Sequence, residues 1–151
     1  RLQLKTFRDR RFLIDGAHNP HAVRAIVRAL RQYFVFDRVL VIFGSTRGHN
    51  LDGMIAEMEP ICTKLYPVSS RHPRAESNRI VAGTAIKRGL DVEIGCAEVG
   101  KALCKALQMS SPNDIILGTG SLSVAAEILE NIDGIVPEVY PVICKKLTVT
   151  S

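Results

Sequence analysis

Residues 11–33 read RFLIDGAHNPHAVRAIVRALRQY and hold one complete strand–turn–helix unit. The run at 11–15 predicts a strand that ends in a glycine turn. Asn19 is a good N-cap, and Pro20 suits the first helical position because an N–H there would have no partner. Apolar residues then recur at helical spacing, which predicts a helix over 20–33 with one buried face. They are Ala22, Val23, Ile26, Val27 and Leu30.

The same alternation of strand and helix continues along the chain. Further strands are predicted at 38–43, 63–68, 91–94 and 114–117. Further helices are predicted at 51–59, 75–87, 97–107 and 122–131. The near-continuous apolar run at 39–43 is typical of a strand that is covered on both faces. We therefore expect an α/β fold, a three-layer sandwich with a mainly parallel, Rossmann-like sheet.

Composition narrows the classes of protein further. The chain has 151 residues, of which 46% are hydrophobic and 23% charged, and this length accommodates one compact domain rather than two. No apolar stretch approaches the ~20 residues that cross a bilayer, and there is no signal-peptide core. The four cysteines are widely spaced and indicate neither a metal site nor a disulfide framework. We expect a cytoplasmic protein without a membrane partner. Because the sequence opens on Arg1, it is either processed or one domain of a longer protein.

The net charge is +5, and the excess of basic residues lies toward the front of the chain. Arg24, Arg28 and Arg31 follow near-helical spacing, which is typical of a solvated helix face as much as of a binding surface. Aromatic residues do not interleave with these charges as base stacking would require. Nucleic acid is therefore the least favoured class of partner, and it would show strongly salt-dependent binding.

In open α/β sheets, ligands bind where strands end and helices begin, which here selects residues 15–20, 44–50, 69–74 and 118–121. The first loop places Asp15, His18 and Asn19 at a helix N-terminus, where free N–H groups and the helix dipole favour anions. Asp15 and His18 could hold a ribose or phosphate, or orient a substrate amine or carboxylate. The alternative is that Asp15 caps a turn and His18 is simply exposed.

Two other loops carry weaker signals. Gly118-Thr119-Gly120-Ser121 lies between a strand and a helix like a phosphate-binding loop, but position 123 is serine and no acid follows at ribose distance. Arg71, His72 and Arg74 form a cationic cluster that could meet a carboxylate-rich tail, or could be a solvated loop.

The string Asp-Gly-Ala-His-Asn-Pro-His-Ala at 15–22 resembles the signature of the C-terminal domain of folylpolyglutamate synthase and dihydrofolate synthase, in the Mur ligase superfamily. Residues 1–2 resemble the end of that family's interdomain linker. Residues 40–44, 70–75 and 118–122 are similar to further family segments. The resemblance assigns 1–133 to a Mur ligase C-terminal (glutamate-ligase) domain and leaves 134–151 as an extended tail.

This resemblance implies an ATP-dependent ligase that activates a folate or dihydropteroate carboxylate as an acyl phosphate, which the amine of L-glutamate then attacks. ATP and magnesium would be bound mainly by an N-terminal ATPase domain absent from this chain, which would be its partner and without which the fragment would be inactive. The implied nucleotide contacts are Arg1, Asp15, His18 and Asn19, with Asp15 and His18 catalytic. Ser121 and Arg74 would bind substrate, and no metal ligand is implied.

One loop departs from the family pattern, because Gly48-His49-Asn50 replaces an Asp-Lys-Asp triplet. The change is compatible with a divergent active ligase, relaxed amino-acid specificity or a lost activity. His49 and Arg47 could replace part of the missing charge, or the segment could be a plain exposed turn. The alternative functions are another Mur-type amino-acid ligase, acting on a cell-wall precursor, and a non-catalytic nucleotide-binding module.

Overall fold

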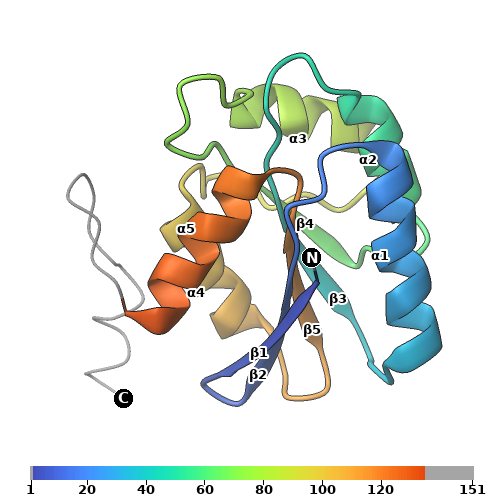
Figure 1. Cartoon of the computed structure of the whole chain (residues 1–151), viewed down its shortest axis with the longest axis vertical. Helices are drawn as coiled ribbons and strands as arrows, with labels where there is room; N and C mark the ends of the chain where they lie inside the picture. The colour runs from blue at the N-terminus through green and yellow to red at the C-terminus, as the bar shows by residue number, and fades with distance from the viewer. Residues whose placement is uncertain (1, 135–151) are drawn as a thin grey trace.

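The computed structural model describes residues 2–134, which form one five-stranded sheet with helices on both faces (Figure 1). The strands are β1 (Gln3–Phe7), β2 (Arg10–Ile14), β3 (Val39–Phe43), β4 (Lys64–Pro67) and β5 (Ile115–Thr119). The helices are α1 (Pro20–Tyr33), α2 (Leu51–Met58), α3 (Asn78–Lys87), α4 (Val99–Met109) and α5 (Leu122–Asp133). The strand order is β1-β2-β5-β3-β4, and only the β1–β2 pair is antiparallel.

Alternation of side chains along each strand builds two cores. In β3, Val39, Val41 and Phe43 pack with α1, α2 and α3, whereas Leu40 and Ile42 face α4 and α5 on the other side of the sheet. All five residues are buried, as expected for a strand covered on both faces. The predicted three-layer α/β sandwich with a mainly parallel sheet is confirmed.

Two edge elements differ from the prediction. Residues 3–7, for which no strand was predicted, form β1, which alternates half-buried and exposed residues and turns into β2 through Arg8 and Asp9, both at positive φ. The predicted strand at 91–94 is wrong: only one bridge, Leu65 to Val92, joins it to the sheet. Apolar residues predicted that strand, but its Ile94 points into solvent and is 70% exposed.

Two helices begin later than predicted. Helix α3 starts at Asn78 rather than 75, because Ser77 caps it and Ala75 pairs with Thr46 instead. Helix α4 runs over 99–109 rather than 97–107. No helix within residues 2–134 is long and apolar enough to cross a membrane. The predictions for Arg1 and for the tail beyond Gly134 lie outside the described residues.

The connections place a binding edge on the sheet. The chain leaves β2 toward α1 on one face, and it leaves the neighbouring strand β5 toward α5 on the opposite face. Such a change of direction opens a crevice at the carboxyl ends of the strands. The loops after β2, β3, β4 and β5 all meet at this edge (Figure 1).

Candidate functional site

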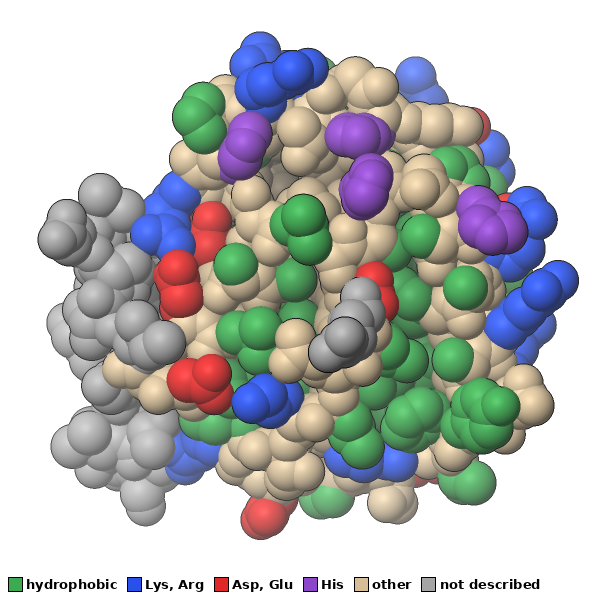
Figure 2. All heavy atoms as spheres, in the orientation of Figure 1, with side chains coloured by type: hydrophobic (Ala, Val, Ile, Leu, Met, Phe, Trp, Pro, Cys, Tyr) green, Lys and Arg blue, Asp and Glu red, His purple; other side chains and the backbone are tan. Residues whose placement is uncertain are grey.

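A shallow cleft of about 320 Å³ lies at the carboxyl edge of the sheet. Four loops contribute to it, and three of its side chains are histidines. Its lining comprises His18, Thr46, His49, His72, Ser121, Leu122 and Ser123. Figure 2 shows histidine side chains grouped at this end of the molecule. The structure thus brings together His18 and Ser121, which were predicted as site residues from the sequence. His49 and His72, from two other loops, lie in the same cleft.

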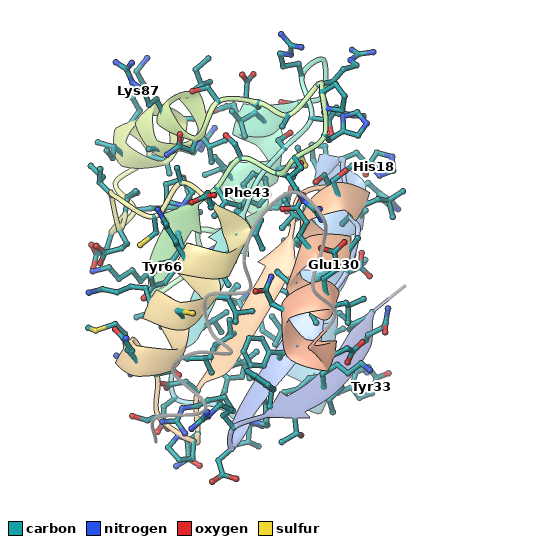
Figure 3. The ribbon with its side chains drawn as sticks, turned by 90° about the vertical axis from the view of Figure 1, so that its left-hand side faces the viewer. His18, Tyr33, Phe43, Tyr66, Lys87 and Glu130 are labelled. Atoms are coloured by element: carbon teal, nitrogen blue, oxygen red, sulfur yellow. The ribbon has the colours of Figure 1, made fainter. Side chains whose placement is uncertain are left out.

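His18 is exposed at the start of α1, with its ring open to the cleft (Figure 3). Its Nδ1 lies 3.3 Å from the carbonyl oxygen of Gly16. When Nδ1 carries the proton it donates to that carbonyl, and Nε2 then accepts hydrogen bonds. The ring also packs edge to face on His49, at 5.2 Å between centroids and an interplanar angle of 70°. His49 therefore supports one side of the His18 imidazole.

Asp15 does not line this cleft. Its side chain closes the turn after β2, where the carboxylate accepts a hydrogen bond from the Ala17 N–H at 2.8 Å. It borders a neighbouring groove of about 290 Å³ between β1 and α5. Leu122, which is 73% exposed, lines both hollows and separates them. Asp15 and His18, three positions apart in the sequence motif, consequently line two different hollows.

Two other nominated residues are helix caps. The Asn19 side chain accepts from the Ala22 N–H at 2.8 Å and caps α1. The Ser121 hydroxyl accepts from the Val124 N–H at 3.1 Å and caps α5, with only 4% of the residue exposed. Asn50 caps α2 in the same way. Three helix N-termini therefore start at this edge, and together they favour negative charge on a ligand.

The loop after β5 uses its backbone donors inside the protein. The Gly120 N–H donates to the Ala17 carbonyl at 3.1 Å, and the Gly118 carbonyl accepts from the Asp15 N–H at 3.0 Å. These two hydrogen bonds join the loop after β2 to the loop after β5. The Gly120 amide is therefore occupied, which argues against a phosphate-cradling loop at 118–121 and agrees with its incomplete glycine pattern.

Glycine is required where the loops after β3 and β5 cross. Gly120 has a φ of +111°, and a Cβ there would collide with the carbonyl oxygen of Gly44 and with the Phe43 ring. Gly44 in turn has the backbone carbonyl of Val68 only 2.6 Å from an added Cβ. These close approaches set the floor beneath the cleft.

The loops after β3 and β4 are joined by a contact that the sequence did not predict. Thr46 and Ala75 form an antiparallel bridge, and the Arg47 N–H donates to the Arg74 carbonyl at 2.8 Å. Residue 75 was predicted as helical, so this pairing was missed. The Arg74 N–H donates to Nδ1 of His72 at 3.0 Å, which leaves the proton of the neutral ring on Nε2.

The cationic cluster predicted at 71–74 divides in two. The Arg71 guanidinium turns toward α5 and pairs with Glu130 at 2.5 Å (Figure 3 labels Glu130), whereas its backbone N–H donates to the buried Glu127 carboxylate at 2.7 Å. Arg74 instead stays exposed beside Arg47, and it does not line the cleft. Within residues 2–134, no group of three or more His, Cys, Asp or Glu side chains is placed to hold a metal ion.

Residues 1–122 match the family described as the Mur ligase, glutamate ligase domain. The chain belongs to this family. The resemblance inferred from residues 15–22 is thereby confirmed, and the described sandwich is the fold of a Mur ligase glutamate ligase domain.

Individual proteins similar to this glutamate ligase domain have been described. A probable bifunctional folylpolyglutamate synthase/dihydropteroate synthase of Halobacterium salinarum is 29% identical over 116 residues, which are 76% of this chain and 14% of that protein. The solved structure of Escherichia coli FolC in complex with DHPP and ADP superposes with a TM-score of 0.80 at 22% identity, over 89% of this chain and 31% of that one.

A second solved structure agrees. It is a bifunctional folylpolyglutamate synthase/dihydrofolate synthase with Mn, AMPPNP and L-glutamate bound, which has a TM-score of 0.75, 22% identity and coverage of 87% of this chain and 30% of that one. At this identity the structures establish the fold. The chain spans under a third of the length of each of these relatives.

Proposed function

We propose that this chain is the C-terminal domain of an ATP-dependent ligase that joins L-glutamate to folates or dihydropteroate. The proposal rests on family membership and on one observation: His18 and Ser121, from the loops after adjacent strands, line one cleft at helix N-termini. It is also supported by relatives whose structures hold DHPP with ADP, or AMPPNP with Mn and L-glutamate.

In this proposal the cleft takes the incoming glutamate. The carboxylates of this glutamate are attracted by the N-terminus of α5, at Ser121, and by the N-terminus of α1. The glutamate amine must lose a proton to attack an acyl carbon, and Nε2 of His18 is the acceptor on this side when Nδ1 is bonded to Gly16. A new C–N bond forms, the acyl C–O bond to phosphate breaks, and inorganic phosphate leaves.

ATP supplies the phosphoryl group that activates the folate carboxylate. On this side, the α1 N-terminus with Asn19 and His18 fits the anionic phosphates of a nucleotide. The Asp15 carboxylate, on the neighbouring groove, fits a ribose hydroxyl. Arg1 stays an expected contact outside the described residues. Magnesium is bound by oxygen ligands such as carboxylates, and residues 2–134 contain no acidic cluster that could supply them. We therefore assign magnesium to an N-terminal ATPase domain. We assign Arg74 to the substrate side. The cytoplasmic location remains a prediction.

The test is phosphate release by the natural full-length protein that carries this domain. We expect release to require ATP, L-glutamate and either dihydropteroate or tetrahydrofolate together, and the 151-residue chain alone to release none. Release with a cell-wall precursor and another amino acid, but not with either folate, would support a different Mur-type ligase. Nucleotide binding without release under any condition would support a non-catalytic module.

A further inference from the structure

Arg47 and Arg74 form a pair of like charges at the rim of the cleft. The Thr46–Ala75 bridge is antiparallel, which sets Arg47 directly opposite Arg74, and the hydrogen bond between the Arg47 N–H and the Arg74 carbonyl fixes this register at 2.8 Å. Like charges directly opposite each other on paired strands destabilise the pairing. Each guanidinium also donates to the backbone of the opposite loop, Arg47 to the Pro73 carbonyl and Arg74 to the Arg47 carbonyl, so both positive charges lie at this bridge.

No carboxylate of the described residues compensates this pair. The Arg47 side chain donates only to the Pro73 carbonyl at 3.2 Å, and the Arg74 side chain only to the Arg47 carbonyl at 3.4 Å. The nearby acid Glu76 accepts from the Ser77 N–H at 3.0 Å and forms no ion pair with either arginine. By contrast, Arg24, Arg38, Arg71 and Arg88 all pair with Asp or Glu side chains.

The pair is continuous with the cleft. His49 lies two residues after Arg47 and His72 two residues before Arg74, and both histidines line the cleft. Figure 2 shows basic side chains at the same end of the molecule as the histidines. Arg74 also lies over Gly48, where an added Cβ would be 3.5 Å from its Nη2, so the open glycine turn leaves room for the guanidinium.

We propose that Arg47 and Arg74 form an oligocarboxylate subsite that holds the γ-linked glutamate tail of a glutamylated folate. This inference rests on the proposed function. Guanidinium groups bind carboxylates in a planar, two-pronged geometry, and each has unused N–H donors here. A carboxylate between the two guanidiniums would also relieve their repulsion. The subsite would make the domain prefer substrates that already carry several glutamates over those with one.

The experiment titrates the 151-residue chain, observed by NMR, with γ-linked pentaglutamate, with free L-glutamate and with ATP, at low and high salt. We expect the pentaglutamate to bind on the order of tenfold more tightly than glutamate, with shifts centred on residues 47 and 74. The double variant Arg47→Gln/Arg74→Gln should lose that preference. The control Arg28→Gln/Arg31→Gln removes the same charge from exposed positions of α1 and should keep it. The rim variant, Arg47→Gln/Arg74→Gln, should unfold at the same temperature as the unmodified chain or at a higher one, because it removes the repulsion between two like charges.

Equal affinity for pentaglutamate and glutamate, or an equal loss in both double variants, would overturn the subsite. If the rim variant weakened the binding of ATP and not that of pentaglutamate, the two arginines would be assigned to phosphate binding. That result would also reject the proposal. These results are separable from the ligase assay. A full-length protein that ligates glutamate without any chain-length preference refutes only the subsite, whereas tail binding without ligation refutes only the proposed activity.

Discussion

The backbone N–H of Arg71 donates to the carboxylate of Glu127 at 2.7 Å, and this bond ties the loop after β4 to helix α5. The Glu127 side chain is only 5% exposed, and its Oε2 also lies 3.5 Å from Nε of Arg71. The loop that carries His72 and Arg74 is therefore anchored on the helix whose N-terminus lines the cleft. Packing of the cleft wall depends on this buried acid.

Glu127→Ala should lower the free energy of unfolding by about 1–3 kcal/mol, because the Arg71 N–H loses a charged acceptor. Glu127→Gln should lose less, because an amide oxygen can still accept that bond. Urea unfolding measures both. The matched control is Glu130→Gln, whose more exposed ion pair with Arg71 should contribute less than about 1 kcal/mol. Equal effects at 127 and 130 would contradict the proposed anchor.

Asp114 should give the domain an acid-sensitive stability. Burial of this residue favours the neutral acid, but hydrogen bonds from Arg38 at 2.6 Å and from the Ser111 N–H at 2.8 Å outweigh burial and lower the pKa of Asp114. Because the folded pKa lies below the unfolded value of about 3.9, the stabilisation is complete above that value and is lost as pH falls through the folded pKa.

Unfolding free energies measured between pH 7 and pH 2 test this dependence. Asp114→Asn should cost about 1–3 kcal/mol at pH 7, and the difference from the unmodified chain should shrink below about pH 4. A difference that stays constant over this range would show that the carboxylate charge is not responsible.

Gly120→Ala should destabilise the chain by about 1–3 kcal/mol or more, since its φ is +111° and its Cβ would strike the Gly44 carbonyl. Gly83→Ala is the control, because Gly83 lies inside α3 with nothing within 4 Å of an added Cβ. That change should stabilise by up to about 1 kcal/mol. Thermal unfolding distinguishes them, and a tolerated alanine at 120 would disprove the close approach of the two loops.

Burial raises the pKa of the Cys62 thiol to about 12, with Asp91 adding to the effect. Burial also raises the pKa of Cys96, though to a smaller extent. Because the thiolate is the reactive form, iodoacetamide at pH 8 should modify Cys96 before Cys62. Peptide mass spectrometry over a time course measures both rates. Modification of Cys62 at the rate seen in denaturant would contradict its burial.

Local sequence predicted the parts of the fold that depend on neighbours in the chain. The unit at 11–33 was correct because its strand, cap and helix are set by short-range spacing, and Asn19 and Pro20 occupy the predicted positions. The edge segments at 3–7 and 91–94 were missed or wrong because strand pairing at an edge depends on distant partners. Val92 has the β-branched side chain typical of a strand, but its backbone forms a bridge only with Leu65.

The site was predicted in part for the same reason. His18 was found from its position after a strand and Ser121 from the family resemblance, and the two do line one cleft. The contact of His49 with His18, the pairing of Arg47 with Arg74, and the diversion of Arg71 to α5 all join loops distant in sequence. Spacing along one chain carries no signal for such contacts.

The most direct test of the account is the rate of glutamate-dependent phosphate release by the full-length protein with His18→Ala, compared with His21→Ala. Both residues are exposed histidines, His18 just before the Asn19 cap of α1 and His21 in its first turn, but only His18 lines the cleft. We expect His18→Ala to reduce kcat on the order of 10²- to 10⁴-fold and His21→Ala to leave it unchanged. Equal rates in the two variants would contradict the role of the cleft in ligation.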